Sequence, residues 1–276
     1  MGISSQQPFS SELLLAEFFQ RGGASDHHSD GWGLAYYDEQ DSQLRHGLQP
    51  AFSCYQARRI ISRHLKATSL LAHIRKATVG DLKLVNAHPF RRSLWGQDWV
   101  FAQNGDLLDY QPELRTGFHP TGETDSERAF CYLFDELSEH YPSRMPSQQQ
   151  LAAILKLLSD DIARHGSFNY LLANHEFMFA YCSTELYWSS LVFDDVILPG
   201  ESAGRQEAQS LTEATGQRVV LISTQPLSLY QPWYPMGRGE LRLFHKGQLT
   251  ATLFDPEKES HPLIVPPAFS QSVLYL

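Results

Sequence analysis

Four short motifs follow one another between residues 72 and 127: AHIRKAT, NAHPF, AQNGDL and GETDSE. They constrain the fold more than any other feature, because each sets a polar group of defined chemistry beside small or turn-forming residues. Those groups are Arg75, His88, the pair Asn104 and Gly105, and Asp125. Polar groups of this kind, placed on or beside apolar segments, fit the wall of one binding pocket. We predict a pocket for a zwitterion.

The residue types indicate how such a pocket would bind its ligand. Arg75 offers a planar fork of donors that suits a carboxylate, and two bonds made together fix the orientation of the bound group. Asp125 can accept from an ammonium group, so the two residues together match both charges of an α-amino acid. The Asn104 amide and the Gly105 N–H are neutral donors of the kind that stabilise an oxyanion. Acyl transfer is the implied chemistry.

Longer segments carry a family resemblance. QRGGASDHHSDGWGLAYY (20–37), FAQNGDL and GETDSERAFC, together with the motifs above, resemble the glutaminase domain of the class II glutamine amidotransferases, most closely its short YafJ-like branch. These segments occur in the family's order from about residue 10 to at least residue 185. The resemblance implies an α+β fold of the N-terminal-nucleophile hydrolase type, a four-layer α/β/β/α sandwich. We expect a single domain over residues 1–276.

The resemblance also implies roles for individual residues. Arg75 would hold the α-carboxylate of glutamine or a γ-glutamyl compound, and Asp125 its α-amine. Asn104 and Gly105 would form the oxyanion hole, while Thr78 and His88 would line the site. Arg21 and Asp30 to Gly33 would support the strand that carries the nucleophile. For His88 an alternative stays open, because a histidine before proline can simply hydrogen-bond a strand end.

One departure from the family is large. The family nucleophile is a cysteine at the mature N-terminus, directly after the initiator methionine, and here that position reads Met1-Gly2. The chemistry needs the terminal residue because its own α-amine, with a reference pKa of about 7.7 to 8.0, can serve as general base. Cys54, Cys131 and Cys182 fall in apolar segments, which indicates small buried hydrophobes. We expect no nucleophile in the chain as printed.

Three explanations compete for this departure. The N-terminus has been lost to a misassigned start or a truncation, the protein is an inactive relative, or another residue replaces the cysteine. The position of QRGG places Met1-Gly2 where relatives have the segment after their first strand, which favours the first explanation. The chain as printed should then release no glutamate from glutamine.

Composition narrows the class of protein. A net charge of −9 and a pI near 5.7 argue against a nucleic-acid binder. Three cysteines without CxxC spacing, and twelve histidines without HExxH, argue against a disulfide framework or a metal site. P-loop, Rossmann and GxSxG patterns are missing, so we expect no cofactor. With no leader or membrane-span pattern, we expect no membrane partner and a cytoplasmic protein.

Local patterns predict the elements. Helices are expected at 10–21, 55–65, 125–140 and 147–165, and strands at 31–38, 69–75, 99–103, 218–224 and 241–254. Segments 168–182 and 185–191 are expected to pair through a Ser-Thr turn, and 193–216 to form a polar surface loop. Thr124 and Glu127 predict a capping box, which places Asp125 in the first turn of its helix.

Each of these residues also has a simpler interpretation. Arg75 alone suits a strand-end surface charge, Asp125 a helix N-terminal acid, and Asn-Gly a type I′ hairpin turn. Their joint occurrence in order favours the site. Three functions then remain: a glutaminase that supplies ammonia to a separate synthase, a hydrolase of γ-glutamyl peptides, and a non-catalytic protein that keeps the glutamine pocket.

Overall fold

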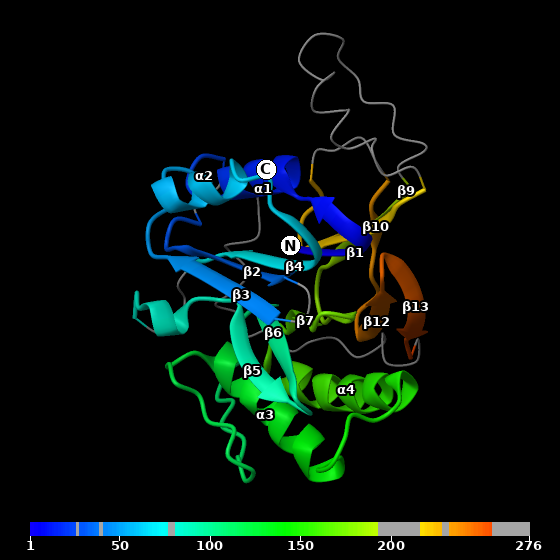
Figure 1. Ribbon diagram of the computed structural model, residues 1–276. Helices are drawn as coiled ribbons and strands as arrows, with labels where there is room; N and C mark the ends of the chain where they lie inside the picture. The colour runs from blue at the N-terminus through cyan, green and yellow to red at the C-terminus, as the bar shows by residue number, and fades with distance from the viewer. Residues whose placement is uncertain (26–27, 39–40, 77–80, 193–215, 228–231, 256–276) are drawn as a thin grey trace.

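Two antiparallel sheets face each other in the middle of the molecule, and a pair of helices covers the outer face of each (Figure 1). The computed structural model describes residues 1–25, 28–38, 41–76, 81–192, 216–227 and 232–255. The layers run α/β/β/α, as predicted. Thr78 and the expected loop at 193–216, except for Gly216, lie outside the described residues.

The first sheet has seven strands in the order β11-β9-β10-β1-β4-β2-β3. Its strands are β1 (Gly2–Ser10), β2 (Trp32–Asp38), β3 (Asp41–Gly47), β4 (Lys66–Ile74), β9 (Tyr187–Val192), β10 (Arg218–Ser223) and β11 (Tyr234–Pro235). Helices α1 (Glu12–Gln20) and α2 (Tyr55–Ile61) cover it. Leu15 and Phe19 of α1 pack with Trp32 and Leu221 of the sheet in one apolar cluster.

The second sheet has six strands in the order β13-β12-β8-β7-β6-β5. Its strands are β5 (Phe90–Leu94), β6 (Gln97–Asn104), β7 (Asn169–Ala173), β8 (Phe177–Cys182), β12 (Glu240–His245) and β13 (Gln248–Leu253). Helices α3 (Asp125–His140) and α4 (Gln148–Ile162) cover it, and short 3₁₀ turns lie at Leu84–Asn86 and Ala163–His165. Phe130 and Phe134 of α3 pack on Phe101 and Trp99.

A third apolar cluster lies between the sheets. It joins Leu71 and Val220 of the first sheet to Val100 and Met178 of the second. Every residue of β7 and β8 is buried, because one face of these strands meets the opposite sheet and the other meets the helices. A strand buried on both faces has a nearly continuous apolar sequence, as FMFAYC does.

The structure corrects three local expectations. Segments 168–182 and 185–191 do not pair: β8 belongs to the second sheet and β9 to the first, so the chain crosses between sheets after Cys182. The capping box at α3 is half formed, because Thr124 accepts from the Glu127 N–H while the Glu127 carboxylate binds Thr121 and Gly122 instead. The residues after Met1 form the central strand β1, rather than a segment that follows the first strand.

Candidate functional site

The Asn104-Gly105 pair ends β6 and does not close a hairpin. Asn104 is the last residue of the strand, opposite Asn169 of β7, and the chain continues toward α3. Gly105 has φ +126°, and a Cβ there would lie 2.1 Å from the Ser167 carbonyl oxygen, so the turn requires glycine. No described residue hydrogen-bonds the Asn104 side-chain amide or the Gly105 N–H. Two neutral donors are therefore available at this turn.

Hydrogen bonds of Asp125 link that turn to the start of α3. Its carboxylate accepts from the Leu107 N–H at 2.7 Å and from the Ser126 N–H at 2.8 Å. Burial raises the pKa of Asp125, and these backbone bonds oppose the shift. The carboxylate oxygens have capacity for a further donor beyond these bonds. Asp125 thus binds the backbone two residues after Gly105. Its carboxylate can still accept a hydrogen bond from a cation.

Arg75 lies just beyond the end of β4 and is only 6% exposed. Both of its terminal nitrogens donate to the Asp81 carbonyl oxygen at 3.2 Å. Its backbone pairs with Gly31 and Asp30, so the DGWG segment supports the strand end that carries Arg75. Burial lowers the pKa of Arg75 and the Asp30 charge opposes that shift, but a guanidinium stays protonated in proteins.

His88 is buried against His73, with ring centroids 4.4 Å apart. Its Nδ1 accepts from the Gln103 N–H at 3.4 Å. Burial lowers the pKa of His88 to about 3 and lowers that of His73 well below its ordinary value. Both rings are therefore neutral near pH 7. Gly33 allows this packing, because a Cβ on it would lie 1.8 Å from the His88 carbonyl oxygen.

Gln103 connects these parts, although it is not among the predicted site residues. Its side-chain carbonyl accepts from the Ser126 hydroxyl at 2.5 Å, and its amide donates to the Ser167 carbonyl at 2.9 Å. With its N–H on His88, it joins the NAHPF segment, the start of α3 and the segment before β7. Its place inside the AQNGDL motif was the available signal.

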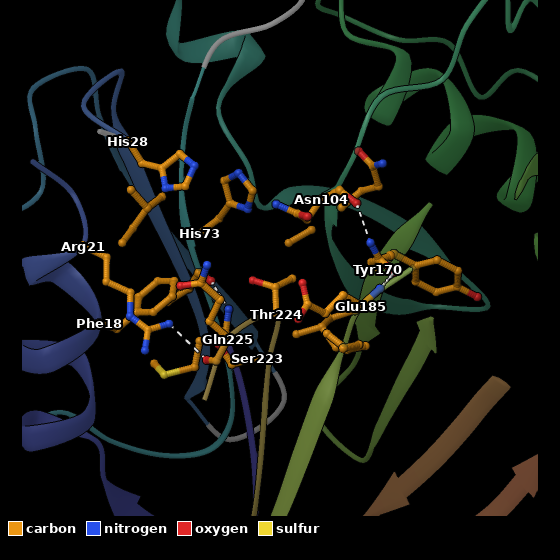
Figure 2. A pocket seen from close by; sticks show the side chains of 18 residues that line it. Phe18, Arg21, His28, His73, Asn104, Tyr170, Glu185, Ser223, Thr224 and Gln225 are labelled. Carbon is orange, nitrogen blue, oxygen red and sulfur yellow. Dashed lines mark hydrogen bonds between the residues drawn. The ribbon is translucent and has the colours of Figure 1, made fainter. Parts of the chain in front are cut away.

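A cavity of about 280 Å³ lies beside Asn104 (Figure 2). Met1 lines it, and the N-terminal amine of Met1 donates to the Ala72 carbonyl at 2.7 Å. Burial, and next the Arg21 charge, lower the pKa of this amine to about 5. Of the predicted site residues, Asn104 lines the cavity, whereas Arg75, His88, Gly105 and Asp125 are not among its lining residues.

The cavity lies where strand β1 would continue beyond Met1, between its two neighbours β4 and β10. Gly2 pairs with Leu71 of β4 and with Ile222 of β10. The next positions along these two neighbours, His73 and Ile74 on one side and Ser223 to Gln225 on the other, line the cavity. Arg21 closes one side by donating to the carbonyls of Gln225 and Pro226. The cavity is therefore one strand wide.

The three cysteines are buried, and none lines the cavity. Burial raises the pKa of Cys131 to about 11 and that of Cys182 to about 12, so both stay protonated near neutral pH. Across the described ranges there is no group of three or more His, Cys, Asp or Glu side chains that could hold a metal ion. No helix in the same ranges has both the length and the apolar character to span a membrane.

Comparison with known proteins decides the family. Residues 1–266 match the family described as "Glutamine amidotransferases class-II".

The chain belongs to the class II glutamine amidotransferases.

Two similar proteins come from bacteria. The "Putative glutamine amidotransferase YafJ" of Escherichia coli K12 is 37% identical over 262 residues, which cover 90% of this chain and 97% of that protein. The "Putative glutamine amidotransferase" of Haemophilus influenzae is 32% identical over 266 residues, which cover 94% of this chain and 88% of that protein.

Solved structures agree on the fold. A predicted glutamine amidotransferase from Pseudomonas aeruginosa PA01 matches with a TM-score of 0.66 and 28% identity, over 91% of this chain and 98% of that one. Glutamine phosphoribosylpyrophosphate amidotransferase of Bacillus subtilis matches with a TM-score of 0.54 and 14% identity, over 91% of this chain and 48% of that one. At that identity the match concerns the fold alone.

Proposed function

We propose that this protein hydrolyses the γ-amide of glutamine or of a γ-glutamyl compound through a cysteinyl thioester. Arg75 holds the α-carboxylate, Asp125 the α-ammonium group, and Thr78 and His88 line the site. Asn104 and Gly105 donate to the oxyanion as the thiolate sulfur attacks the γ-carbonyl carbon. The C–N bond then breaks, ammonia or an amine leaves, and water resolves the thioester to glutamate and free thiol.

One observation carries the proposal: Asn104, whose side-chain amide no described residue binds, and Met1, the residue before β1, line the same cavity. The Met1 amine shows the effect of this environment, because burial lowers its pKa to about 5. A terminal cysteine that precedes Met1 would carry its own α-amine, and the uncharged form of that amine can take a proton from the thiol. In the proposed reaction, Asn104 and Gly105 stabilise the negative charge that develops on the carbonyl oxygen.

The thiol has to come from outside the three internal cysteines, since none of them lines the cavity. A cysteine carried on a segment that precedes Met1 and continues the track of β1 would lie between His73 and Thr224, beside Asn104. We favour this source over a replacement nucleophile. A protein that keeps the pocket and has no nucleophile remains the alternative.

The experiment is mass spectrometry of the N-terminal residue of the native protein, combined with a glutaminase assay. A terminal cysteine together with glutamate release is the expected result, and the chain beginning at Met1 should release none. Turnover by carefully purified chain beginning at Met1 would contradict the proposal.

Free hydrolysis of γ-glutamyl peptides is a second candidate. Strands β10, β12 and β13 complete the two sheets of the glutaminase fold, so residues 216–255 build no acceptor domain in the part of the chain that the structure describes. Ammonia would then pass to a separate synthase, or the released amine would be the product. Comparing kcat/KM for glutamine and glutathione separates the two.

We also propose a cytoplasmic location, because the three cysteines are free thiols.

A further inference from the structure

Asn86 is almost fully buried, at 1% exposed, and the functions described so far give it no role. Its side-chain amide donates to the Asp81 carbonyl oxygen at 3.0 Å. Its side-chain oxygen accepts from the Glu123 N–H at 2.9 Å. One side chain therefore spans two loops that are about 40 residues apart in the sequence. We name Asn86, the Asp81 carbonyl and the Glu123 N–H the Asn86 clamp.

Each loop held by the clamp leads to one of the proposed charge-binding groups. The Asp81 carbonyl that Asn86 binds also receives both terminal nitrogens of Arg75. Glu123 is two residues before Asp125, with the helix N-cap Thr124 between them. Hydrogen bonds thus connect the Arg75 guanidinium through the Asp81 carbonyl and the Asn86 side chain to the Glu123 N–H. From Glu123 the backbone reaches Asp125 through Thr124 alone.

Two neighbours hold the second loop against the Asn86 side-chain oxygen. A Cβ on Gly122 would lie 2.3 Å from the Asn86 side-chain oxygen, so only glycine lets the loop close on that oxygen. The buried Glu127 carboxylate accepts from the Thr121 and Gly122 N–H groups and holds the far side of the same loop. Aspartate at position 86 would keep the acceptor for Glu123 but turn a second oxygen toward the Asp81 carbonyl.

We propose that Asn86 is a positioning residue that fixes the distance between the carboxylate-binding and ammonium-binding groups, and so selects ligands that carry both charges on one carbon. This inference rests on the proposed function. It predicts a coupling between the two charges: a ligand with both should lose more affinity when the clamp is weakened than a ligand with either charge alone.

The test is calorimetric titration with three probes: L-glutamine, 4-carbamoylbutanoate, which lacks the α-amine, and 4-aminobutanamide, which lacks the α-carboxylate. Asn86→Asp should weaken glutamine binding about tenfold, the scale of one lost buried hydrogen bond, and each single-charge probe no more than about twofold. Equal weakening of all three probes, or no change for glutamine, overturns the inference.

Asn174→Asp is the matched control. Asn174 is also fully buried, donates to the Gln97 side chain at 2.7 Å and accepts from the Glu176 and Phe177 N–H groups in the β7–β8 turn. That turn follows Ala173, whereas the site lies by Asn169 at the other end of β7. The substitution carries the same change of donor to acceptor and should leave the affinity ratio of the three probes unchanged. A shift of that ratio equal to the shift in Asn86→Asp would overturn the inference.

A second readout needs no ligand. In Asn86→Ala the Glu123 amide should exchange its hydrogen about tenfold faster or more, and Asn174→Ala should leave that amide unchanged. An unchanged Glu123 rate in Asn86→Ala overturns the clamp itself. If the wild-type protein binds none of the three probes while the exchange result holds, the proposed function falls, and the glutamine role of Asn86 falls with it.

Discussion

The candidate site has two regions that are built in different ways. Around Asn86 the groups are held by backbone atoms: the Asp81 carbonyl takes both nitrogens of Arg75, and the Leu107 N–H holds Asp125. Around Met1 the same fold leaves a cavity, where the Asn104 side chain has no partner among the described residues. The first region suits the binding of a ligand's charged groups, and the second has space for the amide that would react.

The contrast indicates a division of labour. Bound charges gain from groups that are already in place, because little reorganisation is then needed when the ligand arrives. The reacting carbonyl, in contrast, needs donors without partners. The comparison therefore predicts that changes in the clamped region alter affinity, and that changes at the Asn104-Gly105 turn alter the fold of the turn and the rate.

The largest expected effect is on affinity in the clamped region. Arg75→Ala should weaken L-glutamine binding about 100-fold, because in the proposed function Arg75 is the buried, bidentate partner of the α-carboxylate. Calorimetric titration measures this. Arg91→Ala is the control, since Arg91 lies on the outer strand β5 with a half-exposed side chain and should change nothing. Equal binding by Arg75→Ala and the wild type would remove the role assigned to Arg75.

The next effect concerns the turn. Gly105→Ala should lower the free energy of unfolding by about 2 kcal/mol or more, because both the left-handed backbone and the Ser167 carbonyl oppose a Cβ. Gly96→Ala is the matched control: its φ is +73° but nothing lies within 4 Å of the added Cβ. Urea unfolding should show the smaller loss, about 1 kcal/mol, for Gly96→Ala. Equal losses would contradict the close contact at Gly105.

Much of the fold was predictable before the structure. The helix at 125–140 matches α3 at both ends, because the Thr124 cap and the apolar periodicity agree. The pairing of 168–182 with 185–191 was wrong for a long-range reason. The side-chain oxygen of Asn169 accepts from the N–H groups of residues 183 to 185 and holds the chain as it leaves one sheet for the other. A Ser-Thr turn gives no sign of that contact.

The candidate site divides in the same way. The charged and turn-forming residues were identifiable, because their side-chain chemistry and family resemblance point to a role. Asn86 and Gln103 lie inside two of the motifs, but their contacts could not be predicted because they join distant segments. Asn86 binds the Asp81 carbonyl and the Glu123 N–H, and Gln103 binds the Ser126 hydroxyl and the Ser167 carbonyl. A motif shows which side chains are present, and these contacts depend on which groups the fold brings to them.

A smaller effect concerns stability and pH. The pKa of His88 is about 3 in the folded protein and near 6.5 in the unfolded chain. Between pH 3 and pH 6.5 the unfolded chain therefore binds more protons than the folded protein does. Stability should therefore fall as the pH falls from 6.5, by about 1 kcal/mol at pH 5.5 from His88 alone. Urea unfolding at the two pH values measures this. His88→Gln should reduce the dependence, and an unchanged dependence in that variant would contradict the neutral, buried ring.

The smallest effect concerns binding and pH. The pKa of Asp125 is raised by burial, and its ionised form is the one that accepts from an ammonium group. Glutamine affinity should therefore fall a few-fold as the pH is lowered from neutral toward the raised pKa of Asp125, because the carboxylate becomes protonated. Asp125→Asn should bind more weakly and lose this dependence, in titrations between pH 7 and pH 4.5. A pH-dependent affinity that persists in Asp125→Asn would assign the effect to another group.

A crystal structure of the chain beginning at Met1, grown with L-glutamine, tests the central claim most directly, because no thiol should consume the ligand. We predict the α-carboxylate on Arg75, the ammonium group on Asp125 and the γ-carbonyl oxygen within hydrogen-bond distance of the Asn104 amide. Glutamine bound elsewhere, or bound with its γ-amide turned away from Asn104, would contradict the account.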